Sequence, residues 1–441
     1  MDKSWVLHVE NFAKIKSAEI EISPFMCFIG DNNSGKSYLM SLIWGILTLG
    51  KDLFPKNVSE SRSYKACESW LIGHSNQEVI ITEDVSKLYV NWFNELLSNH
   101  KKMLLKKLFN FDIDADKIEI LNYKSKNHMM IKWENQSSKY AVTKTYINFS
   151  TQENYTKEDI SKMNAYICWN LLMSGLASPL YTSIVRGKRT GEPIYLPASR
   201  TGFMLTYSQL LEKSIETNFS SSEDTDHHSM LTLPYVDFLR LIIKFEPSDK
   251  VTHKDIIDFI EGEMTKGLVN VNKAFAPMIK YQPIGESKEL PLFLASSVVS
   301  EVSPILLTLK SNINFNTLMI EEPEAHLHPE LQQKMAQVII RLMNSGVSVW
   351  ITTHSETILQ HINNMIKLKR NKKSKELCKE YSYTKEDLVD ANDVRMYQFS
   401  KIEKEKTILE KLSYNENGFI VPTFNQALQS IVEEVYAFQG E

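Results

Sequence analysis

Residues 30–37 read GDNNSGKS, and this stretch decides the fold. It matches the pattern GxxxxGK[ST] in full. Glycines let the backbone curl so that its N–H groups face a phosphate, and the N-terminus of the following helix adds partial positive charge. The lysine reaches the β- and γ-phosphates of a nucleotide, and the serine hydroxyl is a ligand for Mg²⁺. We therefore expect a phosphate loop built from Gly30, Asn32, Asn33, Ser34, Gly35, Lys36 and Ser37.

The segments around this loop predict a strand before it and a helix after it. MCFIG (26–30) is a continuous apolar run, which is typical of a central strand, and VLHV (6–9) and EIEI (19–22) alternate like half-buried strands. SYLMSLIWGILTLG (37–50) has apolar residues at helical spacing. Strand, glycine loop and helix follow in the order that a phosphate-binding turn requires.

Two further predicted strands end in polar side chains. TLMIEE (317–322) ends in Glu321 and Glu322, and VSVWITTH (347–354) ends in His354. Ligands of an open α/β sheet bind at the carboxyl edge of its strands, so we expect these residues near the phosphate loop. One acid can hold Mg²⁺ while its neighbour orients or deprotonates the attacking water, and His354 can hydrogen-bond the γ-phosphate. Taken singly, a solvated acidic turn and an ordinary loop histidine are the alternatives.

The remaining pattern alternates strands and helices, which predicts an α/β fold with a largely parallel central sheet. We expect core strands at 193–200, 394–399 and 407–412, a helix at 330–344, a turn at 415–418 and a closing helix from about 423. Between 51 and 190 we expect helices at 82–110 and 156–186, the second broken at Pro179 and ending at Gly187. We also expect a small β-meander there, from strands at 118–121, 128–134 and 140–149. The predicted domains are a head in two parts, 1–50 and 191–441, with an insertion at 51–190.

Composition excludes several classes of protein. The 441 residues carry a net charge of −4, with 24% charged and 43% hydrophobic residues, which is ordinary for a globular protein and excludes a globally basic DNA coat. Four scattered cysteines form no CxxC pair, so a reducing cytosol is expected. The N-terminus has no signal-peptide pattern, and the apolar run at 39–49 is too short to span a bilayer. We expect a soluble, cytoplasmic protein with no membrane contact.

Together, GDNNSGKS, LMIEEPEAHLHP (318–329) and ITTHS (351–355) resemble the ATP-binding-cassette type of ATPase head. The specific resemblance is to the RecF, SMC and OLD-type branch, which includes stand-alone AAA/ABC-like ATPases of bacterial defence systems. It covers about 1–50 and 190–440. It implies a P-loop head with a mixed central sheet, and ATP and Mg²⁺ as cofactors. By resemblance, Lys36 and Ser37 are the Walker A ligands, Glu321 the Walker B magnesium acid, Glu322 the catalytic base, Ala325–His328 the D-loop and His354 the switch histidine.

Two other segments resemble parts of this family. LPLFLASSVVSEVSPILLTL (290–309) lies where the family has its signature helix, which implies that Ser296 and Ser297 meet the γ-phosphate bound by a second head. Val298 stands where a glycine is expected, so engagement of the second head's phosphate is expected either to be weaker or to use only Ser297 and the helix dipole. In YLPASRTG (195–202), Arg200 either touches the nucleotide or supports the sheet. No Q-loop glutamine can be assigned.

The resemblance also bears on partners. OLD nucleases carry a C-terminal Toprim domain, whereas the roughly 85 residues after His354 contain no DxD motif with the spacing of such a metal site. The chain therefore resembles an ATPase without the nuclease, similar to the arrangement in the Septu and PARIS defence systems. This implies a homodimer or higher homo-oligomer through the heads, and a separately encoded effector protein, a nuclease.

Nucleic acid is a further candidate partner. The run Lys367–Lys375 holds six basic residues in nine, and Lys101–Lys107 adds four. Such runs either follow a phosphate backbone or form solvated surfaces. The direct alternative is thus a DNA-repair or SMC/RecF-like ATPase that binds DNA itself. The aromatic residues of the insertion suit a core or a protein interface better than base stacking; they include Trp70, Trp92, Phe93, Trp133 and Tyr146.

Two histidine groups are weak candidates for a metal site. His326 with His328, and Asp226 with His227 and His228, lack any further ligand pattern.

Overall fold

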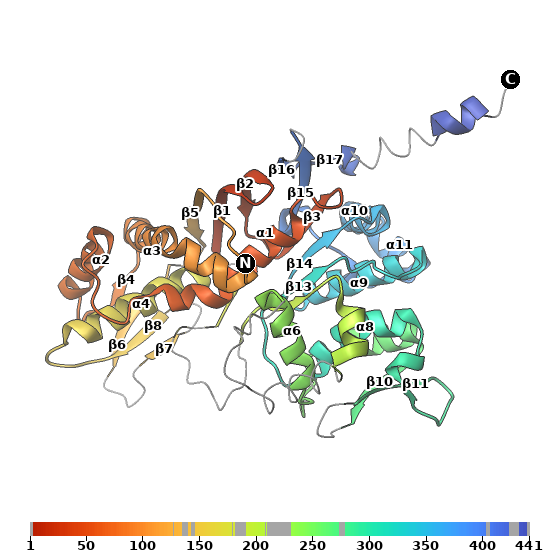
Figure 1. Cartoon of the computed structure of the whole chain (residues 1–441), viewed down its shortest axis with the longest axis horizontal. Coiled ribbons are helices and arrows are strands. Elements are labelled where there is room, and N and C mark those ends of the chain that lie inside the picture. The colour runs from red at the N-terminus through yellow and green to blue at the C-terminus, as the bar shows by residue number, and fades with distance from the viewer. Residues whose placement is uncertain are drawn as a thin grey trace, which may run out of the picture.

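The computed structural model describes residues 3–126, 128–134, 140–142, 146–178, 180, 191–207, 209, 231–272, 278–402, 406–422 and 432–438. Its centre is a nine-stranded sheet with the order β5-β1-β2-β16-β15-β3-β14-β13-β9 (Figure 1). The strands are β1 (Lys3–Phe12), β2 (Ile15–Glu21), β3 (Phe25–Gly30), β5 (Lys117–Ser125), β9 (Ile194–Leu196), β13 (Thr317–Glu321), β14 (Ser348–Thr353), β15 (Val394–Lys401) and β16 (Thr407–Leu412).

The sheet is mixed. Strands β15, β3, β14, β13 and β9 run parallel to one another, while β1 pairs antiparallel with both β2 and β5, and β16 pairs antiparallel with β15. The expected α/β class and the mixed sheet of a P-loop head are therefore confirmed. The parallel half of the sheet holds the strand before the phosphate loop and both polar strand ends.

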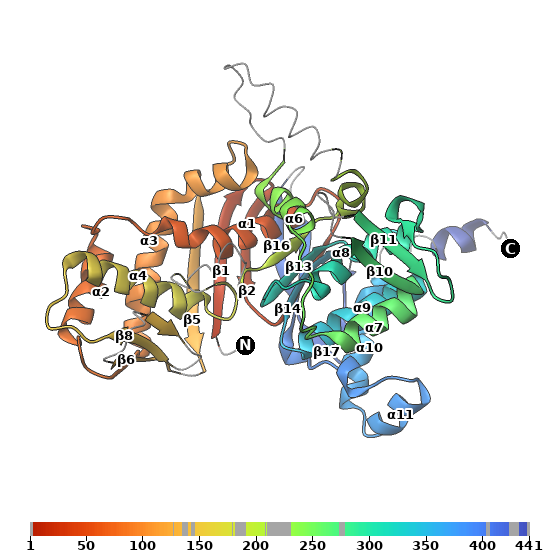
Figure 2. The same ribbon diagram turned by 90° about the horizontal axis from the view of Figure 1, so that it is seen from below.

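Alternation along β3 explains why the phosphate strand is apolar throughout. Met26 and Phe28 face one hydrophobic core, whereas Cys27 and Ile29 face a second core on the other side of the sheet. The first core is covered by α1 (Lys36–Leu49), α3 (Glu83–Phe109) and α4 (Lys157–Met173). The second is covered by α8 (Ser297–Lys310), α9 (Pro329–Asn344) and α10 (Glu356–Arg370), as Figure 2 shows from below. A strand buried on both faces reads as a continuous apolar run.

Part of the segment 51–190 is continuous with the head. The strand predicted at 118–121 is β5, and it pairs with β1 in the central sheet, not with a small meander. The separate small sheet has the order β4 (Val79–Ile80), β6 (Met130–Glu134), β8 (Tyr146–Ser150), β7 (Tyr140–Val142), and β6 and β8 are parallel. Its topology therefore differs from the expected meander. Helices α2 (Arg62–Gly73), α3 and α4 contribute to the same core as β1 and α1.

Other expectations differ from the structure at their ends. The helix expected at 156–186 ends at Met173, because Ser174 has an extended backbone with ψ 132°. Pro179, Gly187 and the group Asp226–His228 lie outside the described residues. Of the closing helix expected from 423, residues 432–438 are helical, and 423–431 are outside the described part.

The smaller elements complete the second half of the chain. They are α6 (Leu233–Ile243), α7 (Lys254–Phe259), the sheet of β10 (Gly267–Asn272), β11 (Met278–Pro283) and β12 (Leu290–Pro291), α11 (Ser374–Glu380), and the hairpin of β17 (Tyr414–Asn415) and β18 (Gly418–Phe419). Among the described helices, none combines the length and apolar character needed to cross a membrane.

Candidate active site

The phosphate loop connects β3 to α1 and contains two glycines that other residues could not easily replace. Gly30 has φ 157° and Gly35 has φ 106°. A Cβ at Gly30 would lie 2.8 Å from the Cβ of Phe399, and one at Gly35 would lie 3.0 Å from Cγ1 of Ile15. Gly35 is also the N-cap residue of α1, so the N–H groups of the first helical turn lack intrahelical acceptors. These groups form the anion-binding end of the helix.

Lys36 is held against the oxygen atoms of its own loop. Its side chain is 6% exposed, and Nζ donates to the carbonyls of Gly30 (2.8 Å) and Asp31 (2.7 Å) and to Oγ of Ser34 (3.4 Å). Burial lowers the pKa of Lys36 from 10.5 to about 8, although Glu322 and Asp31 act in the opposite direction. The other predicted loop ligands, Asn32, Asn33 and Ser37, are exposed.

Glu321 is buried at the end of β13, and each of its carboxylate oxygens accepts one hydrogen bond. The residue is 1% exposed; Oε1 accepts a hydrogen bond from the Tyr195 hydroxyl (2.7 Å) and Oε2 accepts one from the backbone N–H of Ala198 (2.9 Å). The Tyr195 hydroxyl also lies 3.2 Å from Oγ of Ser41 on α1. Tyr195 therefore links the acid at the strand end to the helix that follows the phosphate loop.

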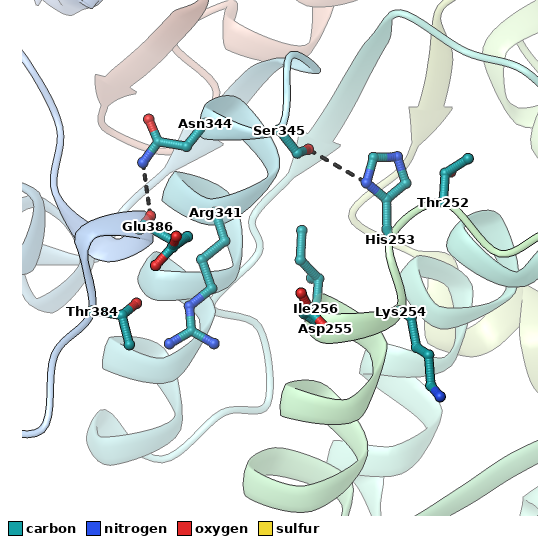
Figure 3. A pocket seen from close by; sticks show the side chains of 10 residues that line it. All are labelled: Thr252, His253, Lys254, Asp255, Ile256, Arg341, Asn344, Ser345, Thr384 and Glu386. Atoms are coloured by element: carbon teal, nitrogen blue, oxygen red, sulfur yellow. Dashed lines mark hydrogen bonds between the residues drawn. The ribbon is translucent and has the colours of Figure 1, made fainter.

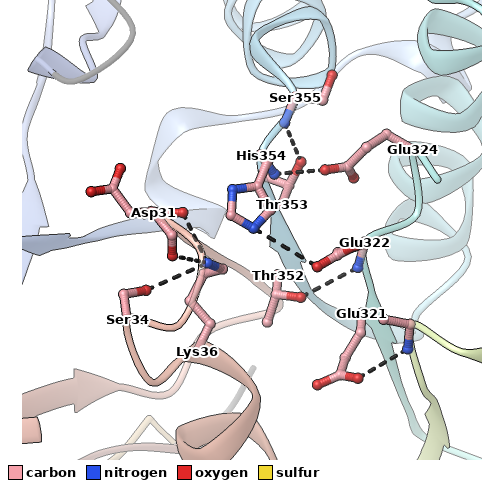
Figure 4. A network of polar contacts seen from close by, with 12 residues as sticks. Asp31, Ser34, Lys36, Glu321, Glu322, Glu324, Thr352, Thr353, His354 and Ser355 are labelled. Atoms are coloured by element: carbon pink, nitrogen blue, oxygen red, sulfur yellow. Dashed lines mark hydrogen bonds and ion pairs between the residues drawn. The ribbon is translucent and has the colours of Figure 1, made fainter. Parts of the chain in front are cut away.

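Glu322 and His354 face each other at the ends of neighbouring strands (Figure 4). Oε1 of Glu322 lies 3.8 Å from Nε2 of His354, and the two side chains are 41% and 31% exposed. The backbone of Glu322 has φ 44°, and its N–H donates to the carbonyl of Thr352 (2.9 Å). Burial, helped by the charge of Lys36, lowers the pKa of His354 against the opposing effect of Glu322. His354 is therefore a neutral imidazole at neutral pH.

The donor set fits ATP with Mg²⁺. Magnesium in nucleotide sites is held by one or two protein oxygens together with phosphates and water. The exposed Ser37 hydroxyl supplies one oxygen at the start of α1. The Glu321 carboxylate has lone pairs beyond the two that accept hydrogen bonds. No group of three His, Cys, Asp or Glu side chains gathers into a metal site in the described part of the chain, the exposed His326 and His328 included.

The structure brings Lys36, Glu322 and His354 together, whereas the two serines of the signature-like helix lie elsewhere. Ser296 is the N-cap residue of α8 and its Oγ accepts from the N–H of Val299 (3.5 Å); Ser297 follows it, and both are exposed. Val298 packs against the second core. Between described residues, no hydrogen bond or ion pair links the two serines to the phosphate loop of the same chain.

Arg200 supports the end of β13. It is 0% exposed, and its guanidinium donates to the carbonyls of Glu321 (2.5 Å) and Glu322 (2.9 Å) and forms an ion pair with Glu301 of α8. Of its two predicted roles, these contacts favour support of the sheet. Glu301 was not among the residues predicted from the sequence.

Three other residues of the site were also missed by the sequence analysis: Tyr195, Thr352 and Glu324, whose Oε1 accepts from the backbone N–H of His354 (2.6 Å). Tyr195 and Glu324 lie within the segments YLPASRTG and EEPEAHLHP, so their position in these motif segments could have indicated that they belong to the site.

The two basic runs have different surroundings. Lysines 101–107 on α3 pair with acids: Lys107 lies 3.0 Å from Asp52, and Lys106 lies 3.3 Å from Asp112. The run 367–375 lies at the end of α10 and the start of α11, where all six basic side chains are exposed. Within it, Lys369 lies 3.7 Å from Asp390 and the Arg370 guanidinium lies 4.6 Å from the ring of Tyr414.

The aromatic residues of the insertion contribute to the first hydrophobic core. Trp92 and Phe93 are fully buried, and Trp70 and Trp133 pack against the same cluster.

A pocket of about 460 Å³ lies at the C-terminal end of α9, away from Glu322 (Figure 3). Its lining includes His253, whose Nδ1 lies 3.4 Å from Oγ of Ser345, and Arg341, which is paired with Asp387 at 2.7 Å. The 16 residues of α9 separate this pocket from Glu322 by roughly 24 Å of helix. The pocket is therefore distinct from the candidate active site.

Comparisons with known proteins address the family. The chain has no match among curated proteins. Many solved structures are similar, and three of them illustrate the likeness. One is an SMC head bound to the C-winged helix domain of ScpA (12% identity, 93% of this chain and 98% of that chain, TM-score 0.37). Another is the SMC head domain from Thermotoga maritima (10% identity, 93% of this chain and 99% of that chain, TM-score 0.34). The third is an Smc head domain with an extended coiled coil from Pyrococcus furiosus, bound to the C-terminal domain of ScpA (11% identity, 98% of this chain and 100% of that chain, TM-score 0.37).

The family model described as AAA ATPase domain matches residues 6–359, which is well over half of the chain. This range of the chain contains the phosphate loop and the two polar strand ends. The chain therefore belongs to the AAA ATPase domain family, and it is an ATPase.

Proposed function

We propose that the chain hydrolyses ATP with Mg²⁺ at the ends of β3, β14 and β13, and that two copies pair through their heads. One observation carries the catalytic part: Lys36, Glu322 and His354 converge at the carboxyl ends of three adjacent parallel strands. A cation for phosphates, a carboxylate for the attacking water and a neutral imidazole are the groups that phosphoryl transfer to water needs.

Each residue has a separate task in this proposal. Lys36 exchanges its loop carbonyls for phosphate oxygens, and Ser37 and Glu321 hold Mg²⁺. Mg²⁺, when bound, neutralises charge on the phosphates. The half-exposed Glu322 takes a proton from the attacking water. His354 hydrogen-bonds the γ-phosphate, and its neutral form leaves it free to donate or accept.

Head pairing is proposed from the exposed N-terminus of α8. Ser296 and Ser297 are exposed there, and the free N–H groups of a helix N-terminus favour an anion. In the proposed pair, this end of each head meets the γ-phosphate bound by the other. Packing of Val298 into the core sets how closely the backbone approaches.

Glu322→Gln tests both parts. The variant should bind ATP, hydrolyse it at least ~100-fold more slowly because the general base is lost, and accumulate as a dimer or larger assembly. Phosphate release and light scattering with and without ATP measure these effects. Glu330→Gln, at an exposed position in the first turn of α9, is the matched control with unchanged turnover. Wild-type turnover in Glu322→Gln contradicts the mechanism, and a monomer at saturating ATP contradicts the pairing.

We further propose that the paired heads act as a sensor or regulator of a separately encoded effector, a nuclease, in bacterial anti-phage defence. The resemblance of EEPEAHLHP and TTHS to stand-alone defence ATPases supports this. If a nuclease is encoded beside this chain, cells that express both should survive phage infection, and the two products should purify together. If Glu322→Gln assembles with the nuclease but no longer protects, hydrolysis is required; full protection by that variant favours a scaffold role.

Direct DNA binding is the second candidate function, because the basic side chains of 367–375 are exposed. Charge reversal of Lys369, Arg370, Lys372 and Lys373 to Glu should weaken DNA binding at low salt, and wild-type affinity should fall steeply with salt. The matched control reverses Lys101, Lys102, Lys106 and Lys107, most of which pair with acids. An absence of DNA binding at low salt eliminates this candidate.

A further inference from the structure

The backbone of Glu322 has a conformation that a residue with a side chain adopts only when its surroundings impose it. Its φ of 44° lies in the left-handed region. On one side its N–H is held by Thr352, through the carbonyl (2.9 Å) and Oγ1 (3.3 Å). On the other side its carbonyl accepts from Nη2 of Arg200 (2.9 Å), and the carbonyl of Glu321 accepts from Nη1 (2.5 Å). The direction of the Glu322 side chain thus depends on Arg200.

The guanidinium of Arg200 is engaged within the protein. Of its five N–H donors, four donate to the carbonyls of Glu321, Glu322, Pro197 (3.1 Å) and Glu301 (3.4 Å). Nη2 also forms the ion pair with the Glu301 carboxylate. Arg200 is fully buried among these partners, which leaves it no open side for a phosphate.

The Arg200–Glu301 ion pair joins α8 to the end of β13. Both side chains are 0% exposed, and the second carboxylate oxygen of Glu301 accepts from the Thr201 hydroxyl. An apolar pair of similar volume is often at least as stable as a buried ion pair, so bulk stability does not account for these charges. Charged partners fix an orientation that an apolar pair leaves free.

Glu301 lies one helical turn after Ser297, on the same helix. A shift of the N-terminus of α8 would therefore move the carboxylate that holds Arg200, and through Arg200 the two carbonyls at Glu321 and Glu322. We propose that Arg200 and Glu301 are positioning residues that make the placement of Glu322 depend on contact between the N-terminus of α8 and a second head. The inference deepens the proposed function and rests on it.

The first experiment separates positioning from folding. In Arg200→Met/Glu301→Leu an apolar pair replaces the ion pair, which keeps the site filled while the guanidinium fork is lost. We expect ATP to bind with wild-type stoichiometry and a KM within about twofold of wild type, because the phosphate loop is untouched. We expect kcat to fall roughly 10- to 100-fold, as for a misplaced catalytic group. Unchanged kcat in the folded variant overturns the positioning role.

A milder change guards against misfolding of the double variant. Glu301→Gln keeps the shape and one acceptor for Arg200 but removes the charge, and kcat should again fall with KM preserved. The matched control is Glu261→Gln, which removes the ion pair to Lys310 (2.5 Å) at the opposite end of α8. Equal losses of kcat in the two variants overturn the proposal, because any weakening of α8 would then suffice.

The second experiment tests the dependence on a second head. Specific ATPase activity of the wild type should rise with protein concentration as heads pair. Glu301→Gln should pair at the same concentrations, measured by light scattering in the Glu322→Gln background, yet its specific activity should stay flat. A wild-type rise in Glu301→Gln overturns the coupling. A wild type without any rise refutes head pairing, and the coupling with it, while the kcat loss at fixed concentration still reports positioning.

Discussion

Replacing Lys36 with methionine should make the nucleotide-free protein more stable while it abolishes ATP binding. Lys36 is 6% exposed, and its pKa of about 8 shows that burial opposes the charged form. Methionine has a similar length and carries no charge. Lys36, which the site needs to bind phosphates, therefore lowers the stability of the nucleotide-free fold.

The size of the effect follows from the pKa. The values 10.5 and about 8 differ by about 2.5, which corresponds to ~3 kcal/mol at 1.36 kcal/mol per pH unit. Loss of the donor to the Gly30 and Asp31 carbonyls and to Ser34 offsets part of this, at ~1 kcal/mol for each acceptor that water does not reach. We expect a net stabilisation of about 1–2 kcal/mol at pH 7. Because the unfolded chain binds this proton more tightly, the cost persists below pH 8 and disappears as the pH rises to 10.5.

Thermal or denaturant unfolding with and without ATP and Mg²⁺ measures this. At ATP concentrations 100-fold above Kd the wild type gains about 2.7 kcal/mol, whereas Lys36→Met gains none, so the order of stability inverts. Without nucleotide, the gap should shrink at pH 9.5. Lys401→Met is the matched control: this lysine is 61% exposed beside Asp31, and its loss should change stability by less than about 1 kcal/mol.

One result refutes the reasoning. If Lys36→Met is less stable than the wild type at pH 7 without nucleotide, the hydrogen bonds of Lys36 to its loop outweigh the burial of its charge. The lysine would then stabilise the folded loop, and the pKa would not be a guide to its cost.

Three further predictions concern the same region. The KM for ATP should rise above about pH 8, by up to about tenfold per pH unit, because the ammonium of Lys36 is lost there, and a KM that is flat from pH 7 to 9.5 contradicts this. Tyr195→Phe should lower the free energy of unfolding by about 1.5–3 kcal/mol, since the hydroxyl donates to the buried Glu321 carboxylate; denaturant titration checks it, and an unchanged midpoint refutes the link. Gly35→Ala should lower the free energy of unfolding by about 1–2 kcal/mol, because Gly35 has φ 106°, and it should abolish ATP binding measured by calorimetry. Gly73→Ala is the control, since a Cβ there meets nothing within 4 Å. Wild-type ATP binding by Gly35→Ala argues against the tight loop.

The phosphate loop and the polar strand ends were predictable because their information is local. GDNNSGKS specifies its own turn, and apolar runs that end in Glu321 or His354 place those residues at one edge of a parallel sheet. The mixed α/β class follows from the same alternation of strands and helices. These features need no knowledge of which distant residues meet.

The rest of the site depends on pairings that no local pattern encodes. Arg200 and Glu301 are 101 residues apart, and the sequence does not mark them as partners: Arg200 has two possible roles in its own segment, and nothing distinguishes Glu301 within 290–309. The hydroxyl of Tyr195 on β9 donates to Glu321 on the neighbouring strand β13, and the two residues are 126 positions apart in the sequence. Likewise, the sequence predicts β5 as part of a small sheet because its neighbours in sequence are strands, yet in the structure β5 pairs with β1 in the central sheet. The competing pairings are decided by burial of the shared core and not by strand propensity.

The strand order has a consequence for how the protein is made. The phosphate strand β3 lies between β14 and β15, and Gly30 packs against Phe399, so the phosphate loop is completed by residues that are more than 300 positions further along the chain. At roughly 5–20 residues per second, the ribosome adds Phe399 about 20 to 70 seconds after Gly30. Until β14, β15 and β16 have been synthesised, β1, β2 and β3 lack these neighbours, and their apolar faces and unpaired edges are open to chaperones or to other nascent chains. The nucleotide site therefore forms late in synthesis, and ATP can assist only the final stage of folding.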